Sequence, residues 1–434
     1  MTRLVLISPT NPDRDIPDRD GLPLGLCMIA SMVRDKLDVA ILDAYSLGLS
    51  VAETIDKALA LEPDLVGIGL PFAFSEISAT EVAGGLKSSK GDLPVIMGGI
   101  QATSRADHFL ENTIADAVTL GEAERTVVDF ADEFLTGGLD AVRRNPPEGL
   151  RILDANGKPV GKRRPLIENL DELPLPSLDL LPGFPSEYAA RILTSRGCAF
   201  RCPYCASSGY WGHVFRAHSP ARVVEEMRRL RDTWGIGQVS LADDTFNQNP
   251  ERAGDIARML IEADLGVEWG ASCRPEMLSG EDLHLYVQAG MTGLFLGLES
   301  GSPRILKAIG RHHDPNKIRD LVRLAVQLGV SVHASFMIGL PDETAEDVEM
   351  TISYARGLPA SSLGYHIFHP LHGSEYGDHP EKYGITWELP EGEHRRIGAI
   401  DTYAPIGTRY LSPLQIIDYY CRARAIAEER LKGG

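Results

Sequence analysis

Short apolar segments alternate with amphipathic segments along the first 140 residues. Five of the apolar segments are typical of strands: "RLVLISP", "DVAILDA", "LVGIGLPF", "PVIMGGI" and "DAVTLGE". Strands that alternate with helices at this spacing form a parallel, doubly wound sheet. Ligands of such sheets bind at the carboxyl ends of strands, where this sequence places Gly98-Gly99 and Gly121-Glu122. We therefore expect a doubly wound, Rossmann-like α/β domain over residues 1–143.

A proline-rich stretch follows this first alternation. Residues 144–188 contain "NPPEGL" and "LPLPSLDLLPGFPSE", with eight prolines in all. Proline removes a backbone donor and clashes with the preceding helical turn, so this stretch does not form a continuous helix. We expect a linker here.

A second alternation begins at residue 190. Its apolar segments are "ARILTSRGC", "QVSLADDTF", "VEWGASC", "TGLFLGLES", "SVHASFMIGLP" and "LGYHIFHP". Helical patterns separate them, such as the one that opens at Ser219-Pro220, a typical helix start. Six such units predict a partial (β/α)6 barrel over residues 189–375, with its polar strand ends at a common mouth. Residues 376–434 are expected to form a short, mainly helical segment.

The composition of the 434-residue chain limits the kinds of molecule that it is expected to bind. A net charge of −18 argues against nucleic acid, which attracts basic surfaces, and is compatible with a cationic small-molecule substrate. The longest nearly apolar run, "GLPLGLCMIASMV", is thirteen residues and too short to span a bilayer, and the first residues lack the layout of a secretory signal. We expect a cytoplasmic protein with reduced thiols and no membrane contact. The oligomeric state stays open, a homodimer included.

Three of the six cysteines lie within eight positions, in "RGCAFRCPYCASSGYWG". Cys198, Cys202 and Cys205 form a C-x3-C-x2-C motif. Structural zinc takes four ligands, so a zinc site needs a further residue such as His213. Three thiolates in one loop after a strand suit a [4Fe-4S] cluster whose fourth iron is open to chemistry.

This motif resembles that of the radical S-adenosylmethionine (SAM) superfamily, with Tyr204 as the aromatic residue before the last cysteine. The resemblance implies that the open iron chelates the amino and carboxylate groups of SAM. It also implies that an electron from the cluster splits SAM into methionine and a 5′-deoxyadenosyl radical, which takes hydrogen from a substrate. A flavodoxin- or ferredoxin-type donor is the implied source of the electron.

The resemblance continues through the later strand ends, in "LADDTF", "SCRPE", "GLESGS" and "FMIGLPDET". It implies that the acidic pair at 243–244 holds the ammonium of SAM, that the ribose lies at "GLESGS" and that the adenine lies at "FMIGLPDET". The planar fork of Arg274 suits a carboxylate. The residues implied to contact SAM are Tyr204, Asp243, Asp244, Thr245, Arg274, Glu299, Ser300, Met337 and Gly339.

Residues 1–140 resemble the cobalamin-binding (B12-binding) domain found ahead of many radical SAM enzymes. The loop after the first strand contains no histidine, so any cobalamin is bound without histidine on cobalt. Two positions depart from relatives: Gln101 stands in Gly-Gly-Ile-Gln instead of Gly-Gly-Pro-His, and Ala123 in Gly-Glu-Ala-Glu instead of Gly-Glu-Gly-Glu. The sequence is compatible with two interpretations of this domain: it binds cobalamin, or it is vestigial and holds no cofactor.

Candidate substrate residues lie near the cysteine loop and in the sixth strand region. "GYHIFHPLHGSEYGDH" contains His366, His369, His372 and His379, which we interpret as pocket lining or proton-transfer groups rather than a metal site. Moving hydroxyl protons in the substrate requires a general acid or base. The candidates for catalysis are His366, Glu276 and Tyr210.

Three functions are compatible with these features. We expect first a lyase-type radical dehydration or deoxygenation of an aminosugar diol in antibiotic biosynthesis, similar to the apramycin-pathway diol dehydratase of this group. The grounds are that Gln101 and Ala123 depart from the cobalamin pattern, that the segment after the barrel is short and that the chain is acidic. The alternative is a cobalamin-dependent C-methyltransferase of a secondary metabolite. A non-enzymatic electron carrier or cobalamin chaperone is the third, and it is disfavoured because a carrier does not need the SAM-contact series.

Overall fold

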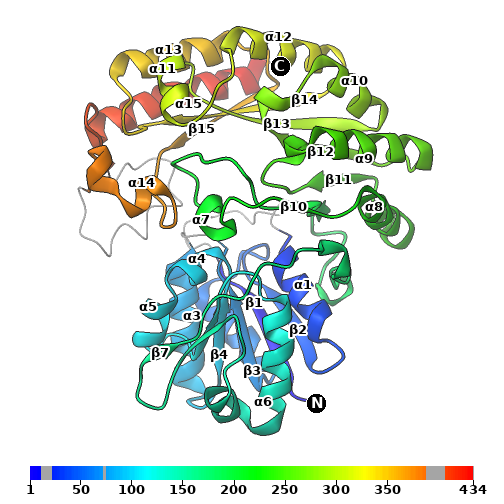
Figure 1. The fold of residues 1–434 in the computed structure, drawn as a ribbon, viewed down its shortest axis with the longest axis vertical. Helices are drawn as coiled ribbons and strands as arrows, with labels where there is room; N and C mark the ends of the chain where they lie inside the picture. Colours follow the sequence, from blue (N-terminus) through cyan, green and yellow to red (C-terminus); the bar gives the residue numbers. More distant parts are fainter. Residues whose placement is uncertain (11–21, 72–74, 388–405, 434) are drawn as a thin grey trace. The chain divides into compact units, whose positions relative to one another are not determined.

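The structure is a computed structural model that describes residues 1–10, 22–71, 75–387 and 406–433 (Figure 1). The chain divides into two compact units, Met1–Ala189 and Ala190–Gly434. In the described ranges, no helix is long and apolar enough to cross a membrane.

The first unit is built on a seven-stranded sheet with the order β2-β1-β3-β4-β5-β6-β7. Strands β1 to β5 run parallel, which confirms the predicted doubly wound sheet. Strands β6 and β7 add an antiparallel edge, and both come from the proline-rich residues 144–188. The strands are β1 Arg3–Ser8, β2 Asp38–Asp43, β3 Leu65–Gly69, β4 Val95–Gly98, β5 Ala117–Thr119, β6 Leu150–Leu153 and β7 Pro159–Val160.

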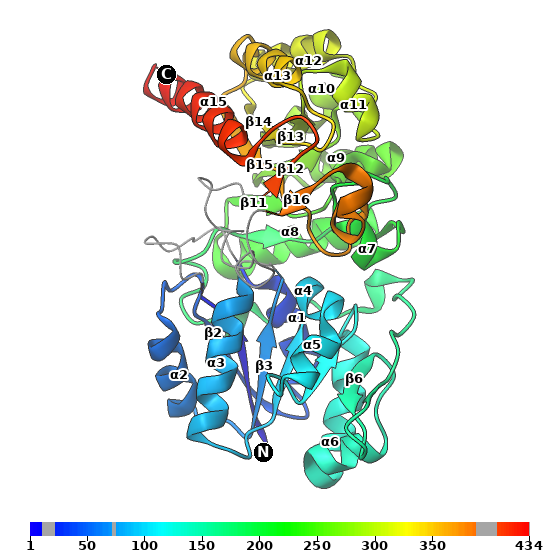
Figure 2. The same ribbon diagram turned by 90° about the vertical axis from the view of Figure 1, so that its left-hand side faces the viewer.

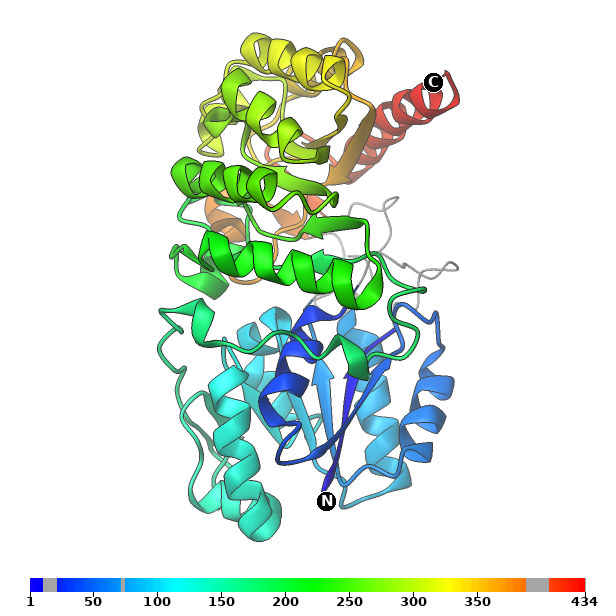
Figure 3. The ribbon, with the colours of Figure 1, turned by 90° about the vertical axis from the view of Figure 1, so that its right-hand side faces the viewer.

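Helices cover both faces of this sheet. Figure 2 shows α2 and α3 in front of the strands, and Figure 3 shows α1 and α6 in front of them. Apolar strand residues such as Val5, Ile68 and Val95 are fully buried between these layers. The helices are α1 Leu24–Val33, α2 Val51–Ala60, α3 Glu76–Ser89, α4 Ile100–Ser104, α5 Ala106–Glu111 and α6 Glu124–Arg144.

The second unit contains a six-stranded, fully parallel sheet with the order β15-β14-β13-β12-β11-β8. Sequential order in a parallel sheet is the arrangement of a barrel wall, so the predicted partial (β/α)6 barrel is confirmed. A two-stranded ribbon, β9 with β10, leads into and out of the cysteine loop. The strands are β8 Arg191–Ile192, β9 Ser195–Arg196, β10 Arg216–Ala217, β11 Gln238–Leu241, β12 Glu268–Cys273, β13 Met291–Glu299, β14 Ser331–Ile338 and β15 Ser362–Ile367.

The two faces of this second sheet differ in chemistry. Side chains alternate along each strand, and one face is apolar and buried, with Trp269, Leu296 and Phe336 at its centre. The row of helices in Figure 3 lies along that apolar face. The opposite face, called the inner face, carries glycine, serine and histidine instead, such as Gly364 and His366. The helices of this unit are α7 Ser207–Trp211, α8 Pro220–Trp234, α9 Pro250–Ala263, α10 Gly280–Gln288, α11 Pro303–Ala308, α12 Pro315–Gln327, α13 Ala345–Arg356, α14 Glu375–Asp378 and α15 Pro413–Gly433.

The predicted helix start at Ser219-Pro220 is also confirmed. Ser219 caps α8 by accepting a hydrogen bond from the backbone of Arg222, and Pro220 occupies the first turn. After the barrel, the chain forms α14, the short ribbon of β16 Thr386–Trp387 with β17 Ile406–Gly407, and α15, which packs against β15.

A buried carboxyl closes the turn that follows β14. Glu343 Oε2 accepts hydrogen bonds from the backbone nitrogens of Gly339 at 2.7 Å and Leu340 at 3.3 Å. The side chain is fully buried, and burial raises its pKa to about 8. The folded protein therefore holds a proton here over a pH range in which an unfolded glutamate has lost it.

We predict that this proton gives stability a pH dependence. Between the ordinary pKa of 4.5 and about 8, only the folded state keeps the proton, so the free energy of unfolding falls as pH rises. The contribution is about 1.4 kcal/mol for each pH unit. Urea unfolding of the wild type and of Glu343→Gln from pH 5 to pH 8 measures the difference in slope. The glutamine variant should lose this part of the slope, and identical slopes would refute the assignment.

Candidate functional site

The three cysteines lie in a loop that leaves β9 through a glycine. Gly197 has φ +82°, and a β-carbon there would lie 2.2 Å from the carbonyl oxygen of Val214, so only glycine fits. A turn then brings the backbone nitrogen of Cys205 to the carbonyl oxygen of Cys202, at 3.1 Å. The backbone of Pro203 also accepts a hydrogen bond from Tyr376 of α14, at 3.0 Å. The loop is thus held at both its entrance and its centre.

The cysteine side chains are partly buried and form no disulfide in the described chain. Burial raises the pKa of Cys198 and raises that of Cys205 to about 11. Thr245 Oγ1 lies 3.8 Å from Cys198 Sγ, as a weak partner. Thiolates in such surroundings require a positive charge beside them, which a bound metal centre supplies.

Tyr204 ties the cysteine loop to the end of β13. Its hydroxyl donates to Glu299 Oε1 at 3.1 Å, and Arg311 Nη2 donates to the same oxygen at 2.8 Å. Burial and the charge of Glu299 raise the pKa of the tyrosine well above its ordinary value. Glu299 has φ +65°, a left-handed conformation that is rare for a residue with a β-carbon. Such strain persists only where surrounding contacts impose it, and it clusters at functional sites.

Arg274 lies directly beside the loop. Its guanidinium is 3.6 Å from the centroid of the Phe200 ring, and Nη1 is 3.5 Å from Cys202 Sγ. Nη2 donates to the carbonyl oxygen of Gly310 at 3.1 Å and lies 3.2 Å from Glu276 Oε1. Both terminal nitrogens therefore contact protein groups, and one of these, Glu276, is a carboxylate, the kind of partner that the sequence predicted.

Glu276 joins the two arginines. Its carboxylate lies 3.4 Å from Arg311 Nη1 and 3.7 Å from His313 Nδ1. Burial alone raises the pKa of Glu276, but His313, Arg311 and Arg274 outweigh it and lower the pKa to about 2. A carboxylate that stays ionised at neutral pH is poorly matched to general acid–base work there. We refer to Tyr204, Arg274, Glu276, Glu299 and Arg311 as the charge network.

The acidic residues after β11 have different surroundings. Asp243 is fully buried and accepts hydrogen bonds from the backbone nitrogens of Thr194 at 2.7 Å and Ser195 at 2.9 Å. Asp244 accepts one from Ser207 Oγ at 2.9 Å, beside the cysteine loop. Burial raises the pKa of both carboxyls. Asp243 therefore fixes the strand that leads into the loop, whereas Asp244 lies nearer to the cysteines.

The residues predicted for the ribose and adenine end of SAM lie on neighbouring strand ends. Ser300 is fully buried, with its hydroxyl 3.0 Å from that of Thr351. Met337 and Tyr204 pack against the same apolar cluster. Gly339 has φ +89°, and its backbone is held by Glu343. The structure thus brings these positions to the same end of the sheet as the cysteine loop.

The inner face carries the predicted catalytic residue His366. Next to it, the rings of Phe295 and His333 stack at 5.1 Å, and Phe295 is 40% exposed. His333 Nδ1 lies 2.8 Å from Ser362 Oγ, and burial and His366 lower the pKa of His333. A β-carbon on Gly364 would lie 2.6 Å from His333 Nε2, so glycine leaves the space that this imidazole needs.

Tyr210 lies in α7, directly after the cysteine loop. Its ring meets that of Trp211 edge to face at 4.6 Å. A β-carbon on Gly209 would lie 2.0 Å from the carbonyl oxygen of Gly373, so α7 approaches the turn after β15 very closely. His213 lies near the carbonyl oxygen of Phe200, with Nδ1 at 3.2 Å. Among the described residues, no three His, Cys, Asp or Glu side chains are grouped so that they could hold one metal ion.

The strand ends of the first unit are closely packed. A β-carbon on Gly98 would lie 2.5 Å from Thr119 Oγ1, and one on Gly99 would lie 2.7 Å from the carbonyl oxygen of Leu70. These glycines are therefore required by neighbouring protein atoms, whereas the sequence attributed them to a ligand. Ala123 has φ −97°, which any residue adopts, so alanine causes no strain there.

Gln101 is part of a buried polar cluster in the first unit. Its Nε2 donates to Glu76 Oε2 at 2.7 Å, and Arg105 Nη1 lies 3.1 Å from the other carboxylate oxygen. Glu76 is 2% exposed, so it depends on these partners. At the position where relatives carry histidine, the amide of Gln101 thus stabilises the buried Glu76 carboxylate.

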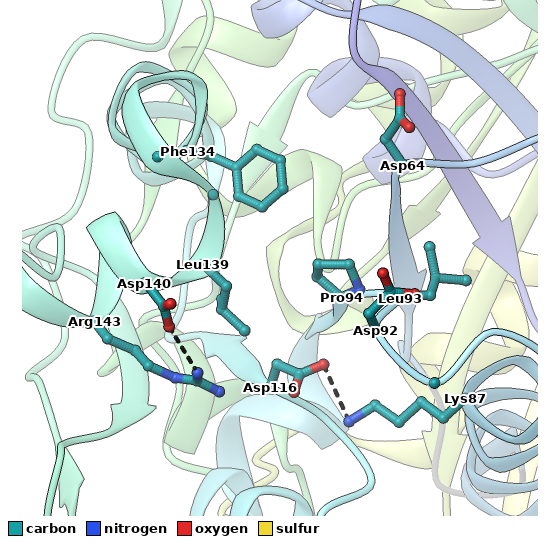
Figure 4. A pocket seen from close by; sticks show the side chains of 13 residues that line it. Asp64, Lys87, Asp92, Leu93, Pro94, Asp116, Phe134, Leu139, Asp140 and Arg143 are labelled. Atoms are coloured by element: carbon teal, nitrogen blue, oxygen red, sulfur yellow. Dashed lines mark hydrogen bonds and ion pairs between the residues drawn. The ribbon is translucent and has the colours of Figure 1, made fainter.

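A pocket opens at the opposite edge of the same sheet (Figure 4). It lies where β3, β4 and β5 begin, away from the glycine-bearing strand ends. Two ion pairs lie within it, Lys87 with Asp116 at 3.0 Å and Arg143 with Asp140 at 3.2 Å. We assign it no ligand. Its lining residues are Asp64, Lys87, Gly91, Asp92, Leu93, Pro94, Asp116, Phe134, Gly137, Gly138, Leu139, Asp140 and Arg143.

Sequence reasoning missed four residues of the site: Phe200, Asn247, Arg311 and His313. Asn247 holds the backbone of Arg274 through two reciprocal hydrogen bonds, at 2.8 and 3.0 Å. Arg311 and His313 lie in the loop after α11, where charged residues usually face solvent. The position of Phe200 between two cluster cysteines was the one available signal.

Comparisons with known proteins agree with this arrangement. Residues 192–355 match the radical SAM superfamily, and residues 17–131 match the B12 binding domain. A protein of Pyrococcus horikoshii described as an uncharacterized methyltransferase is 34% identical over 99% of this chain and 94% of its own length. Cytidylyl-2-hydroxyethylphosphonate methyltransferase of Streptomyces wedmorensis is 26% identical over 83% of this chain and 78% of its own length.

A solved structure shares the fold of nearly the whole chain. The radical SAM methyltransferase TsrM of Kitasatospora setae, with cobalamin and a [4Fe-4S] cluster bound, superimposes with a TM-score of 0.71 at 19% identity, over 90% of this chain and 82% of that one. Both predicted domain types are therefore present in one chain, in the predicted order. The protein belongs to the radical SAM superfamily, in the group whose radical SAM barrel follows a B12-binding domain.

Proposed function

We propose that the protein is a cobalamin-dependent radical SAM C-methyltransferase that acts on a small molecule. The observation that carries this proposal is the 34% identity to a methyltransferase along 99% of the chain. The match to the B12 binding domain supports it, because a methyltransferase of this kind uses both domains.

The sequence led us to favour radical dehydration over methylation. That preference depended in part on Gln101 and Ala123, which depart from the cobalamin pattern of relatives. In the structure Ala123 has an ordinary backbone conformation, and Gln101 has a structural partner in Glu76. The relatives reported above are methyltransferases, so the comparisons favour the alternative.

The cysteine loop fits a [4Fe-4S] cluster bound by three protein ligands. Its donor set is three partly buried thiols, with a guanidinium 3.5 Å from one of them. When bound, the cluster supplies the electron that SAM cleavage requires, and cobalamin carries the methyl group. A ferredoxin- or flavodoxin-type protein is the proposed source of electrons.

The strand ends of the first unit fit a cobalamin that is bound without a protein ligand to cobalt. Small residues, Gly69, Gly98 and Thr119, end β3, β4 and β5. Gln101 Nε2 donates a hydrogen bond to Glu76, which fixes this side chain within the protein. We propose that these strand ends hold the corrin by backbone contact, and that Gln101 keeps their shape.

The substrate is proposed to lie over the inner face. His366 is exposed there, beside the stacked Phe295 and His333, and it is the described histidine best placed to contact a substrate. Tyr210 is proposed to border the same space, since α7 follows the cysteine loop directly. Asp244 and Gly339 are proposed to contact SAM at neighbouring strand ends.

We predict cobalamin-dependent loss of the methyl group from SAM. The full chain is purified anaerobically, its cluster is reconstituted, and SAM with a deuterated methyl group is added with reductant, with and without cobalamin. S-adenosylhomocysteine should form only with cobalamin, and the label should be extracted together with the cobalamin. Release of 5′-deoxyadenosine without any S-adenosylhomocysteine would argue against methyl transfer.

We also predict that Cys202→Ala abolishes cluster binding. Removing one of three thiolates leaves the cluster with two ligands in the loop, so iron content and the brown absorbance should fall to background after reconstitution. Cys421→Ala is the matched control, because Cys421 is exposed on α15, outside the loop. The far-ultraviolet circular dichroism of both variants should match that of the wild type. Full iron content in Cys202→Ala would overturn the ligand assignment.

A further inference from the structure

The sulfur atoms of Cys202 and Cys198 lie beside groups of different charge. Cys202 Sγ has a charged donor, Arg274 Nη1, at 3.5 Å. Cys198 Sγ lies 3.8 Å from the neutral hydroxyl of Thr245. Any cluster bound by these thiols would therefore have a guanidinium, itself paired with Glu276, beside its Cys202 ligand.

Arg274 is held firmly in this position. It is 5% exposed, its backbone is paired with Asn247, and its guanidinium stacks on Phe200 of the loop itself. Gly310 and Glu276 fix the far side of the guanidinium. A side chain with these contacts has little freedom to swing towards another anion.

Charge and hydrogen bonds at ligand sulfur atoms set the reduction potential of iron–sulfur clusters. Reduction adds a negative charge, and a nearby guanidinium stabilises that charge, most strongly where water is excluded. A planar, permanently charged donor is suited to this task.

We propose that Arg274 is a positioning residue for the cluster loop, which raises the reduction potential of the cluster through its contact with Cys202 Sγ. This replaces the sequence-based expectation that Arg274 contacts SAM. The inference depends on the cluster part of the proposed function and not on methyl transfer.

The experiment is a redox titration of the reconstituted, full-length protein without SAM, followed by the electron paramagnetic resonance signal of the reduced cluster. Arg274→Gln should shift the midpoint potential to a more negative value, because the charge is lost. Arg274→Lys keeps the positive charge but lacks the planar guanidinium, so it should shift the midpoint potential less than Arg274→Gln does. Arg201→Gln is the matched control: it removes an exposed arginine of the same loop and should leave the potential unchanged.

Phe200→Leu provides a second route if Arg274→Gln binds too little iron to titrate. It keeps every charge but removes the ring on which the guanidinium stacks, so the midpoint should again become more negative. An unchanged midpoint in Arg274→Gln and in Phe200→Leu would overturn the proposal. If the reconstituted wild-type protein binds no cluster, the cluster assignment itself is refuted. If it binds the cluster but transfers no methyl group, the proposed methyl transfer fails and the role of Arg274 can still be tested.

Discussion

The contact between Glu299 and Arg311 is the interaction on which the rest of the site depends. The carboxylate receives Arg311 and the hydroxyl of Tyr204 on one oxygen, at a backbone position that is strained for glutamate. Buried charges are stable only when they are paired, so loss of Arg311 would leave the Glu299 carboxylate with the neutral Tyr204 hydroxyl as its partner. Through Glu276 and Arg274, the same network reaches Cys202. The cysteine loop is thus fixed by this charge network to the ends of β12 and β13 and to the loop after α11, in addition to the apolar packing of Tyr204.

The fold was predictable because its periodicity is strong. Alternating apolar strands and helical segments gave both parallel sheets, and the strand ends "LADDTF" and "GLES" directed attention to one edge of the barrel. The individual roles were harder to predict. Asp243 and Asp244 are neighbours in sequence, yet one faces the backbone of Thr194 and the other faces Ser207. Which of two adjacent side chains points inward depends on local backbone geometry, and the sequence pattern does not determine that geometry.

The residues that the sequence did not reveal share one physical cause. Arg311 and His313 act through contacts with residues far along the chain, and a loop sequence such as "GRHHD" is ordinarily solvent-exposed. The glycines of the first unit show the opposite case. Gly98 and Gly99 suggested a ligand from sequence, but their missing β-carbons make room for Thr119 and Leu70. A glycine in the sequence indicates that another group lies close to the backbone at that position. Only the structure shows whether that group is a ligand or another part of the protein.

We propose that the charge network presents three cysteines to a [4Fe-4S] cluster and that Arg274 contacts the loop and not SAM. An anaerobic crystal structure of the reconstituted protein with SAM tests it most directly. We expect a cluster bound by Cys198, Cys202 and Cys205, with Arg274 still beside Cys202 and the Tyr204 hydroxyl still bonded to Glu299. A SAM carboxylate paired with Arg274, or a single metal ion in the loop, would contradict it.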